Sequence, residues 1–235
     1  NYAFAGCNKL TGSLRIGLYE ICKICDHAFS GCSGFNELKL YNISDIGPYA
    51  FYQCTGFKGS LEIKRIYERG YYDNYYYSTI SEYAFYGCSG FNGNLSLPAY
   101  TRYIERYAFA GCSNLRENLT IPYRVYSIGD HAFYGCSNLG PILSFYGHYY
   151  GNQPTSQIQY IADYAFYGCS SLSDNLTLSS NLHYIGRYAF AECTSFSNTL
   201  TLTGKSNGVL LHIGNYAFNN THFKILNYNG IVEPS

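Results

Sequence analysis

Ten cysteines have the most versatile chemistry in this 235-residue chain, because thiols form disulfides, bind soft metal ions and act as nucleophiles. Eight of them recur three residues after the Phe of an Ala-Phe pair: Cys7, Cys32, Cys54, Cys88, Cys112, Cys136, Cys169 and Cys193. If the repeats stack about 4.8 Å apart, parallel Cβ vectors suit a disulfide poorly, and a line of sulfurs does not converge on a metal. We therefore predict a structural thiol ladder of small buried side chains, with disulfides between neighbouring repeats as the alternative.

Cys22 and Cys25 lie outside this series and form a Cys-x-x-Cys pair. A zinc site would require a second pair at a suitable spacing, which the sequence does not contain. An ordinary variation of the repeat is favoured, and a local or intermolecular disulfide is the alternative.

The sequence does not contain a recognisable catalytic arrangement. His27 and His131 stand two residues before a Phe, where the other repeats have Tyr, and this favours a structural role for both. The chain has no Gly-x-Ser-x-Gly, His-Glu-x-x-His or phosphate-binding motif. We predict no catalytic, cofactor-binding or metal-ligating residues, no cofactor, and a protein that is not an enzyme. A secreted hydrolase is the weakest alternative.

Asparagine supplies a possible modification signal, because Asn-x-Ser/Thr is the acceptor motif for N-glycosylation. The motif occurs at Asn42, Asn94, Asn118, Asn175 and Asn219. Three of these, Asn94, Asn118 and Asn175, stand nine residues after a Phe, so the motif could also be a recurring start of a strand. We predict glycosylation at these sites if the protein passes through a eukaryotic secretory route.

Tyrosine is abundant, with 29 residues, and gathers in two insertions between repeats, at about residues 66–78 and 145–157. We predict that these insertions project from one edge of the fold as an interaction surface, because a Tyr ring buries area while its hydroxyl keeps a partner. The residues assigned to this surface are Tyr71, Tyr72, Tyr75, Tyr76, Tyr77, Tyr146, Tyr149 and Tyr150.

The Ala-Phe pair occurs nine times, at an interval of about 24 residues that the insertions lengthen. Phe4, Phe85 and Phe166 are each 81 residues apart, so three repeats form a larger module that starts near residues 1, 82 and 163. We predict a single solenoid over residues 1–235, with a C-terminal cap or junction at about residues 219–235.

Each repeat contains short apolar strand segments and a tight turn. Ile lies five residues before the Phe, and an alternating apolar pair, such as Leu61 and Ile63, follows it ten and twelve residues later. The Phe-x-x-Cys-x-x-Leu segment is too short for an independent helix. A single repeat cannot offset the entropy lost in ordering its backbone, so the repeats must stack. The predicted fold is mainly β, a solenoid of about nine coils with short parallel strands and 3₁₀ or irregular turns.

The composition excludes several partners. Basic and acidic residues, 15 of each, cancel to a net charge of zero, so no attraction to nucleic acid is expected. No run of 18 apolar residues exists, so we expect no direct membrane insertion. The chain starts at Asn1, inside a repeat, which indicates either a fragment of a longer array or a subunit that self-associates head to tail or laterally.

The segment Ile128-Gly129-Asp130-His131-Ala132-Phe133-Tyr134-Gly135-Cys136-Ser137-Asn138-Leu139 resembles the BspA-like leucine-rich repeat, and the likeness extends over almost the whole chain. The resemblance implies a curved, right-handed leucine-rich-repeat solenoid of the kind found on surfaces of anaerobic protists and bacteria. It also implies roles in adhesion and in binding partner proteins, without catalytic residues. The chain departs from the pattern in its Tyr content, its insertions and its second repeat, where Leu38 and Leu40 lie one residue early.

We therefore expect a non-enzymatic, extracellular or cell-surface protein with a structural or adhesive role, which assembles head to tail into a filament. The alternative is a monomeric recognition ectodomain that binds a protein or glycan ligand through its curved face or its Tyr-rich insertions. Deletion of residues 68–78 separates the two, because the first hypothesis predicts lost assembly and the second predicts lost ligand capture at unchanged size.

Overall fold

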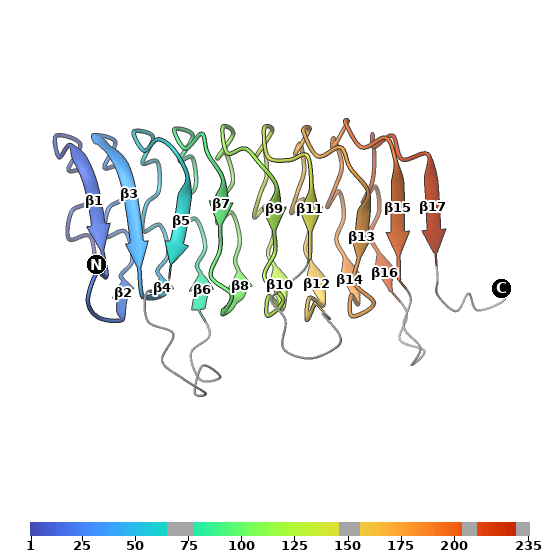
Figure 1. The fold of residues 1–235 in the computed structure, drawn as a ribbon, viewed down its shortest axis with the longest axis horizontal. Coiled ribbons are helices and arrows are strands. Elements are labelled where there is room, and N and C mark those ends of the chain that lie inside the picture. Colours follow the sequence, from blue (N-terminus) through green and yellow to red (C-terminus); the bar gives the residue numbers. More distant parts are fainter. Residues whose placement is uncertain (65–77, 146–155, 204–210, 229–235) are drawn as a thin grey trace.

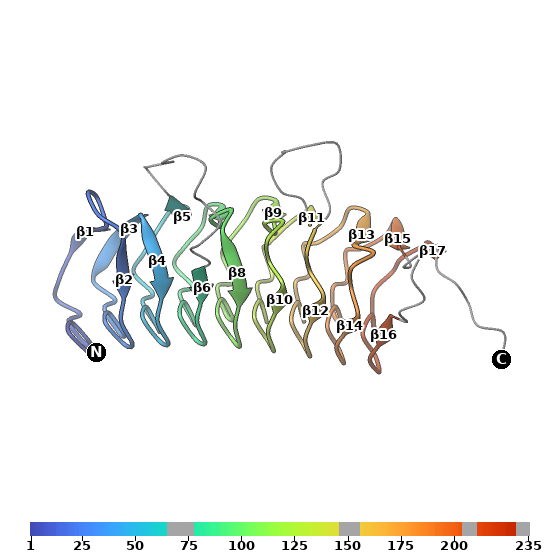
Figure 2. The ribbon, with the colours of Figure 1, turned by 90° about the horizontal axis from the view of Figure 1, so that it is seen from below.

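The computed structural model shows one elongated rod in which successive coils of the chain stack side by side (Figure 1). It describes residues 1–64, 78–145, 156–203 and 211–228. Within these residues every regular element is a β-strand, and no helix is long and apolar enough to cross a membrane. The rod bends only slightly along its length (Figure 2).

One long side of the rod is an eight-stranded parallel sheet. Its strands are β2 (Cys22–Ile24), β4 (Ile43–Ile46), β6 (Ser78–Ile80), β8 (Thr101–Ile104), β10 (Ser127–Ile128), β12 (Tyr160–Ile161), β14 (Tyr184–Ile185) and β16 (His212–Ile213). The recurring Ile keeps these strands in register, so that Ile128 is paired with Ile104 on one side and with Ile161 on the other. These three side chains are buried, which places their face of the sheet against the core.

The opposite side carries the strands of the alternating apolar pair, in three shorter parallel sheets. They are β1 (Gly12–Ile16), β3 (Phe35–Tyr41), β5 (Leu61–Lys64) and β7 (Leu95–Ser96); β9 (Leu119–Thr120) and β11 (Leu143–Ser144); and β13 (Leu176–Leu178), β15 (Thr199–Leu202) and β17 (Ile225–Tyr228). Equivalent leucines face one another across neighbouring strands, as Leu176 does with Leu200. The predicted β-solenoid with short parallel strands is therefore confirmed.

Tight turns that carry the Ala-Phe pairs close the coils, and no 3₁₀ helix is assigned in the described residues. Within a turn, the Cys136 N–H donates to the Phe133 carbonyl at 3.1 Å. Between coils, the Phe109 N–H donates to the Ala132 carbonyl at 2.8 Å, and the same bond recurs along the rod. The first coil begins at its turn, so the sheet has eight strands whereas the Ala-Phe turns number nine.

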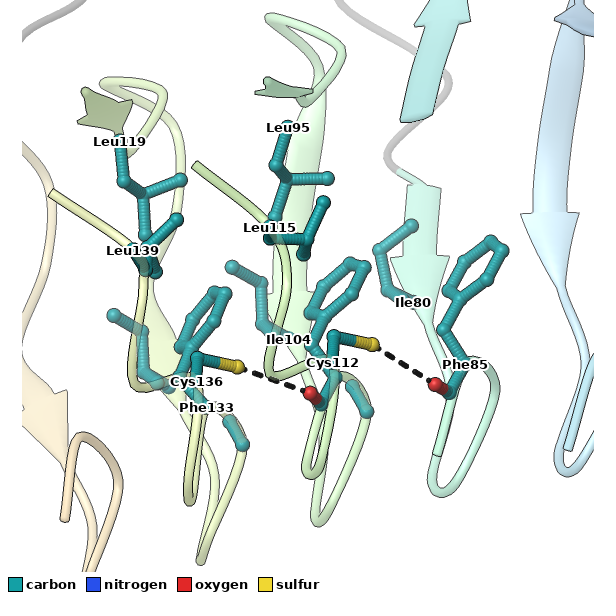
Figure 3. Close-up of a cluster of buried hydrophobic side chains, with 14 of the residues drawn as sticks. Ile80, Phe85, Leu95, Ile104, Cys112, Leu115, Leu119, Phe133, Cys136 and Leu139 are labelled. Carbon is teal, nitrogen blue, oxygen red and sulfur yellow. Dashed lines mark hydrogen bonds between the residues drawn. The ribbon is translucent and has the colours of Figure 1, made fainter. Parts of the chain in front are cut away.

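The core consists of columns of equivalent side chains. The Phe109 ring is fully buried, and its centroid lies 5.3 Å from that of Phe85 and 5.2 Å from that of Phe133, with the rings nearly parallel. Leucines and isoleucines of successive coils fill the space beside the rings (Figure 3). Burial of one such ring contributes about 2–3 kcal/mol, and only stacking makes this burial complete.

A bulge absorbs the shift of the second repeat. Strand β3 pairs with β1 through this irregularity, after which Leu14 faces Leu38 and Ile16 faces Leu40. On its other side, Leu40 is paired with Ile63 of β5. Leu38 and Leu40 are both buried, so the second coil keeps the same interior as its neighbours.

Each turn contains two residues in the left-handed conformation, which the sequence reasoning did not predict. The first is the Tyr or His two residues before the Phe, with φ between 54° and 60°: Tyr2, His27, Tyr49, Tyr83, Tyr107, His131, Tyr164, Tyr188 and Tyr216. The second stands two residues after the Phe and is Gly in six turns, but Gln53, Glu192 and Asn220 in the others. A side chain in this conformation costs about 1–2 kcal/mol, so the surroundings must stabilise the Tyr and His residues.

Candidate functional site

The thiol column lies inside the rod, next to the Phe column. Seven of its cysteines are buried, and Cys7 in the first coil is half-buried. Each buried thiol donates a hydrogen bond of 2.9–3.3 Å to the carbonyl oxygen of the Phe one coil earlier, as Figure 3 shows for Cys112 with Phe85. None of the ten cysteines, all of which the structure describes, is in a disulfide. The sulfur therefore fills apolar space and also satisfies a buried carbonyl.

Burial suppresses the nucleophilic chemistry of this column. It raises the pKa of the Cys54, Cys136 and Cys193 thiols to about 12, and raises the pKa of Cys88 and Cys112 well above the usual value. Desolvation of the thiolate is the main cause in each case. Since the thiolate is the nucleophile and the metal ligand, these sulfurs have little reactivity near neutral pH.

The Cys-x-x-Cys pair lies at the start of the eight-stranded sheet. Cys22 opens β2 and is half-buried, whereas Cys25 follows the strand and is exposed. Within the described part of the chain, no three His, Cys, Asp or Glu side chains come together as a metal site would require. The pair therefore has no further ligands around it in that part of the chain.

His27 and His131 belong to a column of stacked rings that runs through all nine turns. The rings of successive Tyr and His residues lie 4.4–5.0 Å apart, with interplanar angles of 7–19°. His131 stacks between Tyr107 at 4.5 Å and Tyr164 at 4.7 Å, and its Nδ1 is buried without a hydrogen-bond partner. Between the first and last rings, neighbours cover one another's faces, so this column stabilises the strained turns and turns its ring edges to solvent.

The five candidate glycosylation sites fall into two groups. Asn118, Asn175 and Asn219 are exposed, and Asn94 is half-buried. The Oδ1 atoms of Asn118 and Asn175 accept hydrogen bonds from Ile142 N and Thr199 N of the next coil, at 3.1 and 3.0 Å. These bonds use the amide oxygen and not the nitrogen that would carry a glycan, so both roles weighed for this position are compatible.

Asn42 is different, because the folded chain holds its amide inside the rod. Its side chain is only 3% exposed. Its Nδ2 donates a hydrogen bond of 3.0 Å to the carbonyl oxygen of Gly17, and its φ of 48° places it in a left-handed bend between β3 and β4. A glycan on Nδ2 would need space that the folded chain does not leave around this buried amide.

The Tyr-rich insertions fall outside the described residues. The segments 65–77 and 146–155, which contain Tyr71, Tyr72, Tyr75, Tyr76, Tyr77, Tyr146, Tyr149 and Tyr150, are not described, and neither is the end of the C-terminal segment, residues 229–235. The role of these tyrosines as an interaction surface stays a prediction.

A second group of aromatic residues lies on the outer face of the eight-stranded sheet, over strands β8 to β14. We call Tyr103, Tyr126, Tyr160 and His183 the aromatic strip. Tyr103 and Tyr160 are 39% and 40% exposed. Neighbouring centroids lie 6.1 Å apart for Tyr103 and Tyr126, 5.6 Å for Tyr126 and Tyr160, and 6.0 Å for Tyr160 and His183. The first two pairs meet at 74° and 53°, so their rings are tilted and not stacked.

Polar side chains hold the aromatic strip from the side where the strands begin. The guanidinium carbon of Arg102 lies 4.8 Å from the Tyr126 ring centroid, in a cation–π contact. Arg102 Nη1 also donates to Gln157 Oε1 at 2.7 Å. Partial desolvation raises the pKa of the Tyr126 phenol, with a smaller effect from the adjacent Tyr160. Arg102, Tyr126 and Gln157 thus connect three neighbouring coils.

The aromatic strip does not follow from the positions that recur in every repeat, so the periodic pattern alone does not predict it. The corresponding outward positions of the first three strands carry Lys23, Asp45 and Thr79. Aromatic residues appear at or beside this position only from Tyr103 onward. That departure from the repeat was the signal available in the sequence.

Comparison with known families gives one match. The model of the BspA-type leucine-rich repeat region matches the chain in six copies, over residues 1–77 and 78–233. No curated protein matches the sequence. The matched residues include the turns, strands and thiol column described above.

Among the solved structures that resemble the rod are two leucine-rich proteins. One is a leucine-rich repeat protein from Bacteroides ovatus, with 22% identity and a TM-score of 0.54, over 95% of this chain and 64% of that one. The other is a leucine-rich cell surface protein from Faecalibacterium prausnitzii, with 21% identity and a TM-score of 0.51, over 97% of this chain and 62% of that one. At these identities the likeness shows a shared fold. This chain spans less than two thirds of the length of either protein.

Proposed function

Because this chain belongs to the BspA-type leucine-rich repeat family, we propose that it serves recognition or adhesion at a surface and carries out no catalysis. The observation that carries this proposal is the division of each coil into a repeated frame and a varied outer face. The Phe, Cys, Ile and stacked Tyr/His columns repeat from coil to coil, whereas the outward positions of the eight-stranded sheet change from Lys23 and Asp45 to Tyr103 and Tyr160. A rigid frame that displays varied side chains suits binding.

The reactive side chains support the non-enzymatic part of the proposal. The thiols are hydrogen-bonded to backbone carbonyls inside the core, with raised pKa values. His27 and His131 are held between rings on both faces. None of these groups is placed as a nucleophile or general base with an oriented partner.

We place the protein outside the cell or on its surface. The support is the family itself and the Faecalibacterium prausnitzii relative in fold, which is described as a cell surface protein. Antibody labelling of intact and permeabilised cells tests the location, since labelling that requires permeabilisation would contradict it.

Printed arrays of purified glycans and purified proteins test the recognition function. The folded 235-residue chain should bind at least one array saturably, and heat unfolding should abolish this binding. Absence of saturable binding on both arrays contradicts the proposal. Turnover of chromogenic ester, peptide or glycoside substrates contradicts its non-enzymatic part.

Self-association, head to tail or side by side, is the second candidate function. At each junction the Phe N–H of one coil donates to the Ala carbonyl of the next coil along the chain. Each turn therefore donates toward the C-terminal end of the rod and accepts from the N-terminal end. By the same geometry the first coil directs the Ala3 carbonyl outward, and the last directs the Phe218 N–H outward. Tyr2 and Tyr216, the first and last rings of the described column, are each 61% exposed, so a ring from another copy could continue the stacking at either one.

Sedimentation of the 235-residue chain over a range of concentrations tests this assembly. Head-to-tail stacking predicts growing oligomers that Tyr216→Arg abolishes and Tyr134→Arg leaves intact, since Tyr134 lies in a central coil. A lateral contact predicts assembly that both variants retain. A monomer at all concentrations contradicts both forms of assembly.

A further inference from the structure

The aromatic strip is a part of the described surface that the repeat does not explain. Columns that stabilise the solenoid run through every coil, as the stacked Tyr/His rings do from Tyr2 to Tyr216. The aromatic strip lies over strands β8 to β14, which lie side by side along one face (Figure 2), and the stacked pair Tyr184 and His212 continues the aromatic positions to β16, whereas β2, β4 and β6 have none. Strands β2, β4 and β6 carry polar side chains at the equivalent outward positions, and the solenoid forms there all the same. Large rings here are therefore not needed for folding.

The rings of the aromatic strip are open to a ligand, in contrast to those of the Tyr/His column. Tyr103 and Tyr126 meet edge to face at 74°, and Tyr126 and Tyr160 are tilted by 53°, so these neighbours do not cover one another's faces as stacked rings do, whereas Tyr160 and His183 are stacked at 24°. Ser127 stands between Tyr103 and Tyr160 in the strand register, paired with both. Its small side chain lets Tyr126 lie against both neighbours and keeps the outer parts of Tyr103 and Tyr160 clear, at 39% and 40% exposure.

The surroundings of the aromatic strip indicate the chemistry of the ligand. The aliphatic side chains of these strands, Ile104, Ile128 and Ile161, are buried, so the rings supply the apolar surface. Between and beside the rings lie a hydroxyl, an amide and a guanidinium, from Ser127, Gln157 and Arg102. Phenol hydroxyls and the His183 ring add further polar groups. This combination suits a molecule with flat apolar C–H faces rimmed by hydroxyl groups, and lacks the continuous apolar area of a protein interface.

From this geometry we infer that the aromatic strip of Tyr103, Tyr126, Tyr160 and His183 binds an oligosaccharide of pyranose sugars. Sugar ring faces lie against Tyr103 and Tyr160, and sugar hydroxyls exchange hydrogen bonds with Gln157 and Arg102. Three strand spacings separate β8 from β14, a distance of about 14 Å, which accommodates a short oligosaccharide and not only a single ring. This assignment rests on the proposed recognition function and names its ligand class.

A glycan array with three groups of probes tests the inference: neutral hexose oligosaccharides, N-acetylhexosamine oligosaccharides and uronic-acid oligosaccharides. The folded chain should bind one group, and calorimetry with the best probe should show saturable binding. If the ligand is a uronic-acid oligosaccharide, added salt and Arg102→Gln should both weaken binding strongly. If the ligand is a neutral oligosaccharide, binding should depend little on salt.

The double variant Tyr103→Ala/Tyr160→Ala identifies the site. It should lower the affinity for the best probe at least tenfold, while Tyr134→Ala leaves the affinity unchanged. Tyr134 is a matched control, because it is 39% exposed but stacks on Tyr167 at 5.0 Å outside the aromatic strip. Melting temperatures close to that of the parent show that both variants fold, as expected for half-exposed rings.

Three outcomes overturn the site. Unchanged glycan affinity in the double variant places sugar binding elsewhere and leaves the recognition function intact. Binding to a protein array with no glycan bound replaces the sugar with a protein ligand, and again leaves recognition intact. Binding to neither array removes the proposed function together with the site.

Discussion

The thiol of Cys136 donates a hydrogen bond of 3.2 Å to the carbonyl oxygen of Phe109, one coil earlier. That carbonyl already accepts the N–H of Cys112 within its own turn, at 3.1 Å. The cysteine column is therefore both a filler of the core and a set of donors between coils. A methyl group would fill part of the same volume without donating to the carbonyl.

The rate at which each cysteine is alkylated in the folded protein should follow the exposure of its thiol. Seven thiols are buried, with raised pKa values, so iodoacetamide at pH 8 should leave them unmodified in the folded protein. Exposed Cys25 should react first, and half-buried Cys7 and Cys22 more slowly. Peptide mass spectrometry before and after denaturation measures this. Rapid native labelling of Cys112 or Cys136 would contradict a closed core.

Truncation of a central Phe ring should lower the free energy of unfolding strongly. Phe109→Ala removes a fully buried ring with a stacked neighbour on each side and should lower the free energy of unfolding by roughly 3–5 kcal/mol. Phe4→Ala is the matched control, because Phe4 is 46% exposed and stacks on Phe29 alone, so its loss should cost clearly less. Urea unfolding of the three proteins measures both. Equal costs would show that stacking adds nothing to burial.

Because the second left-handed position of each turn strains any residue with a side chain, introducing glycine there should raise the stability of the protein and removing glycine should lower it. Gln53 has a φ of 57° where six other turns have Gly, so Gln53→Gly should stabilise the protein by about 0.5–1 kcal/mol. Gly111→Ala should destabilise it by about 1 kcal/mol. A Cβ at Gly111 would meet nothing closer than Gly87 Cα at 3.6 Å, so strain and not collision is responsible. Thermal melts check both signs, and a stabilising Gly111→Ala would refute the explanation.

Acidification should weaken the fold through His131. Desolvation between its stacked neighbours lowers the His131 pKa, against the opposing influence of Asp130 and Asp163 and with support from Arg106. In the unfolded chain the imidazole titrates near its usual value of about 6.5, so the unfolded state takes up the proton first. Stability should therefore fall as the pH drops below about 6.5, and the loss is complete below the folded-state pKa.

The variant His131→Tyr isolates this effect, because Tyr occupies the same position in seven other turns and does not titrate in this range. Melting temperatures from pH 7.5 to pH 5 should fall less for the variant than for the parent. Parallel curves for the two proteins would mean that His131 is not a source of the pH dependence.

Glycosylation should follow exposure if the chain is secreted by a eukaryotic host. Exposed Asn118 and Asn175 should carry glycans, whereas buried Asn42 should not once the fold has formed. Peptide mass spectrometry after expression in such a host measures occupancy. A glycosylated Asn42 in protein that still melts cooperatively would contradict its placement against Gly17.

Much of the fold could be predicted because its signals are periodic. The Ile before each Phe and the alternating leucines mark strands β10 and β13 directly, and their recurrence requires stacked coils. The shifted Leu38 and Leu40 also find their places, since a bulge in the β1–β3 pairing restores the register.

The backbone conformation of Tyr107 could not be predicted in the same way. Tyr rarely adopts a positive φ, so its propensity predicts another conformation. Stacking on the rings of Tyr83 and His131 offsets the strain of this backbone conformation. The aromatic strip was missed for the opposite reason. It breaks the period, and its meaning depends on which residues face outward on neighbouring strands.

The uniform hydrogen bonding from each Phe N–H to the Ala carbonyl of the next coil makes every junction in the rod chemically alike. Gain or loss of one whole coil would recreate this hydrogen bond at the new junction, which favours changes of array length by whole coils. Extra residues within an Ala-Phe turn would disrupt the contacts on both sides. In this chain the two Tyr-rich insertions instead follow β5 and β11, where each coil passes from its second strand to the first strand of the next, so added sequence leaves the hydrogen bonds of the turns unchanged.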